Sequence, residues 1–121
     1  MKPEKESLHP VPGERKTRIA MLNDRLRMHG LGGKMMITRG IADLGEETVR
    51  NVLQAMRQHS AWTKDNDPYG EHDFGVITLA DGLKAYFKID YYDALMEYGS
   101  DDPADPEKTV RVLTLMLPEE Y

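Results

Sequence analysis

The dipeptide Asp81-Gly82, between two β-rich runs, constrains the fold more than any other feature of this sequence. Residues 74–79 read FGVITL and residues 83–90 read LKAYFKID. Asp-Gly favours a type I′ turn, because both central residues of that turn need a positive φ. The pattern therefore predicts a β-hairpin in which Ala80 pairs with Leu83.

This register places two aspartates at the open end of the hairpin. Asp73 would stand directly opposite Asp90, and like charges in that position destabilise a sheet. The same register would give the hairpin one apolar face, expected to cover the helices. The pairs on that face would be Thr78–Ala85, Val76–Phe87 and Phe74–Ile89.

The remaining elements follow from periodicity and capping signals. Ile19, Leu22 and Leu26 share one helix face after a candidate N-cap at Thr17, and glycines at 30–33 end that helix. Residues 34–38 and 109–117 read as strands, and a capping box at Asp43 and Glu46 predicts a second helix to about residue 60. We therefore expect an α+β fold, with two helices packed on one face of a mostly antiparallel sheet of about four strands.

Composition limits the classes of protein. The chain has 121 residues, no cysteine and a net charge of −5. It suits one domain, excludes disulfide scaffolds and thiolate zinc sites, and argues against coating nucleic acid. Residues 1–16 are polar and proline-rich, which predicts a flexible N-terminal arm before a single domain at 17–121. Without an apolar stretch of about 18 residues, we expect no membrane span and a cytoplasmic location.

Acidic side chains and tyrosine concentrate in two loops, which we take as candidate partner-binding segments. The first precedes the hairpin, and the second, SDDPADP, spans residues 100–106. Turn formation needs only some of these residues, so a ligand or partner role is plausible for the others. The candidates are Asp65, Asp67, Tyr69, Glu71, His72, Asp73, Asp101, Asp102 and Asp105.

The facing pair Asp73 and Asp90 leaves two readings open. In one, Lys88 or Arg111 neutralises the pair and the site is purely structural. In the other, a divalent cation such as Mg²⁺ or Mn²⁺ is bound. Its candidate ligands are Glu71, His72, Asp73 and Asp90.

A catalytic alternative follows from the second reading. His72 would be a general acid or base oriented by Asp73 or Asp90, as in a small metal-dependent hydrolase or phosphodiesterase. No Gly-x-Ser-x-Gly nucleophile motif accompanies it.

Four segments together resemble an uncharacterised domain-of-unknown-function family of alphaproteobacteria. They are NDPYGEHDFG at 66–75, FKIDYYD at 87–93, DPADP-x-x-TVRVLT at 102–114 and EEY at 119–121. The likeness spans about residues 17–121 and implies no catalytic residues. It implies a genetic context, since members of this family are often carried on plasmids and mobile elements, where small acidic proteins often counter host defence.

We therefore expect a non-enzymatic binding protein that uses no cofactor. A counter-defence inhibitor of the anti-CRISPR or anti-restriction type would present its acidic loops to the basic groove of a nucleic-acid-processing complex. Such a protein would bind a protein partner as a monomer or homodimer, with no direct contact to nucleic acid or membrane. The alternatives are the metal-dependent hydrolase and a housekeeping interaction domain.

Overall fold

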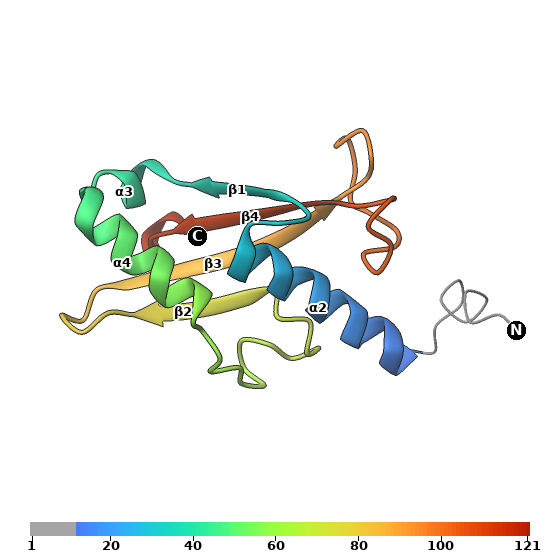
Figure 1. Ribbon diagram of the computed structural model, residues 1–121, viewed down its shortest axis with the longest axis horizontal. Coiled ribbons are helices and arrows are strands. Elements are labelled where there is room, and N and C mark those ends of the chain that lie inside the picture. Colours follow the sequence, from blue (N-terminus) through green and yellow to red (C-terminus); the bar gives the residue numbers. More distant parts are fainter. Residues whose placement is uncertain (1–11) are drawn as a thin grey trace, which may run out of the picture.

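The protein folds as two helices packed on one face of a four-stranded sheet, which confirms the expected α+β class (Figure 1). The computed structural model describes residues 12–121. The strand order is β1-β4-β3-β2, with β1 and β4 parallel and the other neighbours antiparallel. In chain order the elements are α2 (Pro12–His29), β1 (Lys34–Ile37), α3 (Arg39–Ala42), α4 (Glu46–Arg57), β2 (Phe74–Thr78), β3 (Lys84–Tyr92), β4 (Val110–Met116) and the 3₁₀ turn η1 (Pro118–Glu120).

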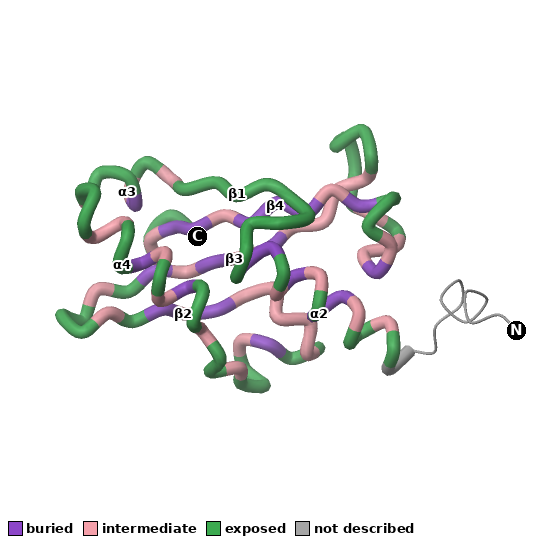
Figure 2. Tube along the Cα trace, viewed as in Figure 1, coloured by how far each residue is buried: buried purple, intermediate pink, exposed green. Residues whose placement is uncertain are grey.

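The core lies between the helices and the inner face of the sheet. Leu26 of α2 and Met56 of α4 are fully buried against Phe87, Leu113 and their neighbours. Figure 2 shows burial along the central strands β3 and β4, whereas β1 is exposed along its whole length. Among residues 12–121, no helix is both long enough and apolar enough to cross a membrane.

The hairpin forms where expected, but its predicted register is wrong by one residue. Leu79, not Ala80, faces Leu83, and the loop has three residues instead of two. Gly82, at φ 92°, provides the left-handed residue that closes such a loop. Because side chains alternate along a strand, this shift moves each predicted apolar pair apart. Asp73 consequently faces Ile89 and not Asp90, with the Ile89 N–H donating to the Asp73 carbonyl at 2.8 Å.

The helix boundaries also differ from those predicted. Helix α2 begins at Pro12, so residues 12–16, assigned to the flexible arm, are helical, and Thr17 is not the N-cap. The rest of the predicted arm lies outside the described residues. The capping box at Asp43 is wrong as well. Asp43 ends the short helix α3, whose N-cap is Thr38, and α4 begins after Gly45 without a side-chain cap.

Glu120 of η1 links the segment that follows β4 to the segment that follows β1. Its carboxylate accepts hydrogen bonds from the Thr38 hydroxyl and from the backbone N–H groups of Gly40 and Leu117. These bonds lower the pKa of Glu120, the Thr38 hydroxyl contributing most. They fix Tyr121 beside the start of β2, where its ring centroid lies 5.6 Å from that of Phe74.

Candidate functional site

His72 anchors the acidic loop, residues 58–73, to helix α2. Its Nδ1 lies 3.0 and 3.1 Å from the two carboxylate oxygens of Asp24, and its backbone N–H donates to Asp67 Oδ1 at 3.0 Å. Its ring stacks flat on Trp62, with centroids 4.1 Å apart and planes at 4°. His72 has a φ of 60°, which non-glycine residues seldom adopt, so these contacts hold a strained turn.

Arg27 ties the end of α4 to the same cluster. This guanidinium is 3% exposed and donates to the carbonyls of Met56 at 2.8 Å and of Arg57 and His59 at 3.2 Å. It also pairs with Asp24 at 3.0 Å. Carbonyls at a helix C-terminus lack intrahelical donors, so a buried arginine there satisfies them and fixes where the acidic loop begins.

A second imidazole, that of His59, packs into the same cluster. His59 packs edge-on against Trp62, with centroids 4.6 Å apart. Burial, together with the positive charge of Arg27, lowers the pKa of His59. A neutral ring suits this apolar site, since a charged one would have to lose its hydration there.

A second polar network explains the role of Arg111 and Glu71. Asn23 donates to the Glu71 carbonyl at 3.0 Å and to the Tyr91 hydroxyl at 2.8 Å, and Tyr91 donates to the Glu71 carboxylate at 3.0 Å. Arg111 donates to Asn23 Oδ1 at 2.8 Å and to the Pro103 carbonyl. Burial raises the pKa of Tyr91 and lowers that of Arg111.

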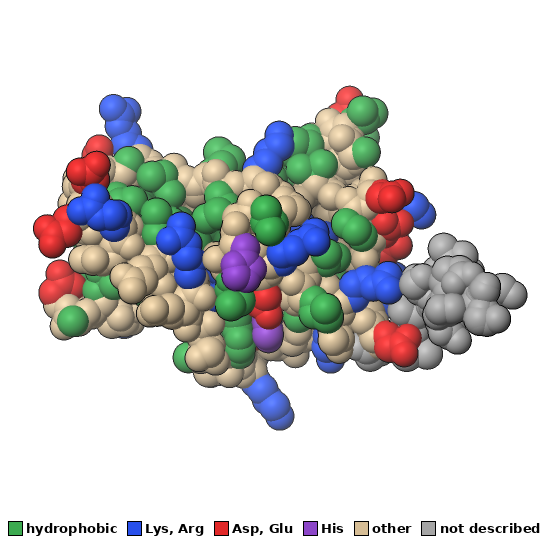
Figure 3. Space-filling view, viewed as in Figure 1, with side chains coloured by type: hydrophobic (Ala, Val, Ile, Leu, Met, Phe, Trp, Pro, Cys, Tyr) green, Lys and Arg blue, Asp and Glu red, His purple; other side chains and the backbone are tan. Residues whose placement is uncertain are grey.

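Two carboxylates of the second acidic loop have partners within the protein. Asp102 pairs with Arg15 of α2 at 2.8 Å, and Asp105 accepts the backbone N–H of Glu107 at 2.9 Å. Asp101 is exposed. On the face shown in Figure 3, most acidic side chains lie toward the two ends of the described surface, one lies at the centre beside the histidines, and basic side chains are spread over the whole face.

Four of the predicted residues, Asp65, Tyr69, Asp73 and Asp90, line a common groove of about 520 Å³. Burial, with the nearby charge of Glu71, raises the pKa of Asp73 to about 6. Lys88 pairs with Asp90 at 2.9 Å. The sequence predicted that this ammonium would bridge both Asp73 and Asp90, and among the described residues its ion pair is with Asp90. The lining residues are Asp65, Asn66, Pro68, Tyr69, Asp73, Phe74, Tyr86, Lys88, Ile89, Asp90 and Tyr121.

Aromatic rings form one wall of this groove. The centroids of Phe74, Tyr86 and Tyr121 lie 5.3 to 5.8 Å apart in tilted and edge-to-face arrangements. Tyr69 and Tyr121 are 71% and 74% exposed, so their surfaces are open to a ligand. The groove thus combines aromatic surface with carboxylates. The ring nitrogens of His72 instead face Asp24 and Asp67.

The structure does not gather the predicted metal ligands. Glu71 bonds to Tyr91 and His72 to Asp24, while Asp73 and Asp90 line the groove. Within residues 12–121, no group of three or more His, Asp or Glu side chains is arranged to hold a metal ion. The carboxylate that orients His72 is Asp24, and not Asp73 or Asp90.

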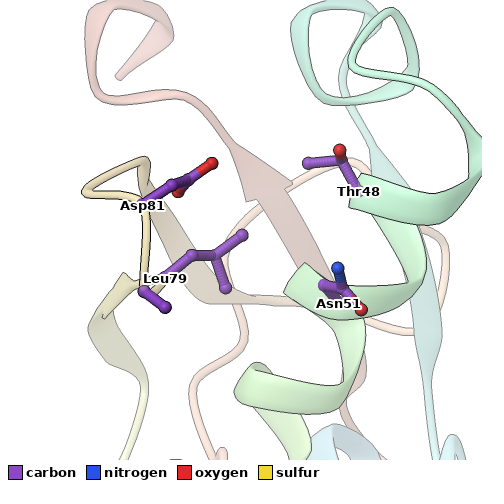
Figure 4. A pocket seen from close by; sticks show the side chains of 5 residues that line it. Thr48, Asn51, Leu79 and Asp81 are labelled. Atoms are coloured by element: carbon purple, nitrogen blue, oxygen red, sulfur yellow. The ribbon is translucent and has the colours of Figure 1, made fainter.

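A further hollow of about 380 Å³ lies between α4 and the hairpin loop (Figure 4). Thr48 and Asn51 extend from α4 toward Leu79 and Asp81 of the hairpin. Asp81 accepts the Leu83 N–H at 3.0 Å and is the one ionisable group among the lining residues. This hollow offers less chemistry than the groove.

Sequence reasoning missed the α2 residues of the site. Asn23 and Arg27 are four residues apart, and both interrupt the buried side of α2, a signal that polar groups are satisfied there. Trp62 is the single tryptophan of the sequence. Nothing local indicated that it would stack on His72.

Comparison with known proteins gives one match. Residues 37–120 match the model of a family described as protein of unknown function, DUF3768. No curated protein and no solved structure matches the chain. The family description assigns no activity to any of the site residues.

Proposed function

Because the chain belongs to the DUF3768 family, whose description gives no function, its role must be argued from its own residues, and we propose that it is a non-enzymatic protein-binding domain. Its partner would present a basic surface to the groove beside the acidic loop. The sequence indicated two acidic loops as the binding surface. The proposed surface is smaller: Asp65, Tyr69 and Asp73 of the first loop, together with Asp90 of β3.

The observation that carries the proposal is a carboxylate in the groove without a cation. Within residues 12–121, no Lys, Arg or His nitrogen lies within ion-pair distance of Asp73, and Lys88, the one cation lining the groove, is taken by Asp90. The negative charges of Glu71, Asp67 and Asp90 all raise the pKa of Asp73. A partner's cation would relieve this repulsion while aromatic surface provides contact area.

The arrangement of His72 gives no support to the hydrolase alternative. A general base needs a free nitrogen facing a substrate or nucleophile. Here Nδ1 is held by Asp24, and Nε2 points toward Asp67 Oδ2 at 3.9 Å. Trp62 covers one face of the ring. These contacts suit a structural role for His72, which holds the acidic loop against α2.

The family likeness supports a more specific version of the proposal. Carriage on alphaproteobacterial plasmids and mobile elements, together with a cytoplasmic location, would place the protein beside host defence systems. The partner would then be the basic nucleic-acid-binding groove of a CRISPR or restriction complex, engaged as a protein-level inhibitor. A housekeeping interaction domain would use the same groove on a partner unrelated to nucleic acid.

The test is plasmid transformation in cells with an active CRISPR or restriction system. We expect the wild-type protein to restore transformation, and the triple variant Asp65→Asn/Asp73→Asn/Asp90→Asn to fail. The matched control, Glu97→Gln/Glu107→Gln/Glu119→Gln, removes the same charge outside the groove and should behave as wild type.

Binding measurements on the purified complex separate the alternatives. Affinity should fall steeply with salt and be unchanged by EDTA. Activity of the triple variant equal to wild type, or loss of binding with EDTA, would contradict the proposal. Recovery of a partner that does not handle nucleic acid would favour the housekeeping alternative.

A further inference from the structure

We propose that the groove receives one arginine side chain of the partner, its guanidinium against Asp73 and its plane on the aromatic wall. This inference rests on the proposed function and specifies the chemistry that the groove recognises. The groove has the size of a small-ligand site, which typically measures about 300–1,000 Å³.

Charge defines one end of the occupant. Asp90 is engaged by Lys88 at 2.9 Å, and this contact raises the pKa of Lys88, so the ammonium and carboxylate are already matched. Asp73 lacks such a partner among the described residues and lies among other acids. A single positive group delivered to Asp73 would complete the charge pattern without displacing Lys88.

The aromatic wall defines the shape of that positive group. Phe74, Tyr86 and Tyr121 line the groove, and their rings meet one another in tilted and edge-to-face contacts. A planar cation can lie on such a ring while its N–H groups reach a carboxylate, and tyrosine and phenylalanine both attract cations to their faces. The Tyr121 ring is the most exposed of the three and offers the most open surface.

Arginine fits these two requirements better than lysine. Guanidinium is planar, weakly hydrated and able to bond a carboxylate through two parallel N–H groups. An ammonium is compact and strongly hydrated, and it would bring a second point charge close to Lys88. Arginine spreads its charge over three nitrogens, so the groove should discriminate between the two cations.

The test uses three capped pentapeptides that differ only at the centre, with arginine, lysine or the neutral isostere citrulline between Gly-Ser and Ser-Gly. Each is titrated into the full chain and followed by ¹H–¹⁵N NMR. We expect the arginine peptide to shift the amide signals of Phe74, Tyr86 and Tyr121, and to bind about tenfold more tightly than the lysine peptide. The citrulline peptide should cause no saturable shift.

Two variants locate the site. Asp73→Asn keeps the shape of the carboxyl group and should weaken arginine binding about tenfold, and Tyr121→Ala should weaken it about fivefold. Glu107→Gln, which lies outside the groove, is the control. Amide spectra of each variant establish that it is folded before titration.

The outcomes separate this inference from the proposed function. Equal binding of arginine and lysine peptides, both lost in Asp73→Asn, would overturn arginine selectivity and leave a general cation-binding groove. Arginine binding that is unaffected by Asp73→Asn and Tyr121→Ala would overturn the assigned position. Failure of both cationic peptides to bind would count against both proposals.

Discussion

His72 and Trp62 stack with their ring planes 4° apart, and this contact closes the acidic loop onto the core. Trp62 also meets His59 and Phe87 edge-on, at 4.6 and 6.0 Å between centroids. One indole therefore joins the loop, the end of α4 and the inner face of the sheet. Asp65, Tyr69 and Asp73 of this loop also line the groove, so the attachment of the loop supports the groove.

Trp62→Ala should destabilise the protein by about 2–4 kcal/mol, since it removes buried aromatic surface and leaves the strained His72 turn without its stacking partner. Urea unfolding followed by circular dichroism measures this. Trp62→Phe, which keeps a ring, should recover about half of the loss. Equal losses in the two variants would mean that stacking is not what holds the loop.

Arg27→Met should cost about 2–4 kcal/mol, although the substitution preserves an apolar stem. It leaves the carbonyls of Met56, Arg57 and His59 and the carboxylate of Asp24 without this donor. Arg25→Met, on the same helix but exposed, is the control and should stay within about 0.5 kcal/mol of wild type. Thermal and urea unfolding of the pair provide the comparison.

Gly75→Ala should be strongly destabilising, because a methyl group at this position would collide with the edge of the Phe87 ring and approach His59 Nε2. Overpacking of this kind costs about 1–3 kcal/mol. At Gly99 the nearest atom is a Tyr91 backbone oxygen 3.8 Å away, so Gly99→Ala should be nearly neutral. The unfolding midpoints of the two variants test this difference.

Asp73→Asn should stabilise the protein at neutral pH. Burial, with the charges of Glu71, Asp67 and Asp90, raises the pKa of Asp73 from 3.8 to about 6, so folding favours the protonated form. The protonated carboxyl of Asp73 contributes its full stabilisation below about pH 4, and this stabilisation is lost as the pH rises through about 6.

The variant should therefore match wild type near pH 4 and exceed it near pH 7.5 by on the order of 1 kcal/mol, allowing for solvent screening of this half-exposed group. Unfolding free energies across this range measure the difference, and Asp101→Asn controls for the charge removed. A difference that does not change with pH would rule out the shifted pKa as its cause.

The sequence predicted the positions of the strands more accurately than the register in which they pair. Asp81-Gly82 located the hairpin, but it does not say whether the loop holds two or three residues, and that count decides which face each side chain occupies. Gly75 gave no help, since a residue without a side chain carries no sign of burial. In the observed register the Phe87 ring packs over Gly75, where no other residue would fit without a shift.

The candidate site was predicted in part, because its residues come from distant segments. The acidic loop itself was recognisable, and Asp65, Tyr69, Asp73 and Asp90 do share a groove. The Asp24–His72 contact joins residues 48 positions apart, which no local pattern could indicate. Glu71 and His72 were candidate ligands in sequence, but their polar groups contact residues of α2 and β3. Asp67, a candidate for partner binding, accepts the backbone N–H of His72 within the loop.

The parallel pairing of β1 with β4 has a consequence for how this protein is made. Residues 34–37 pair with residues 112–115, so β1 gains its neighbour only when nearly the whole described chain has left the ribosome. Until then the backbone N–H and C=O groups of β1 lack the strand that pairs with them and are available to other chains. Because β4 is made last, we expect a solubilising domain fused at the N-terminus to raise the yield of folded protein by keeping the unpaired strand from associating with other chains.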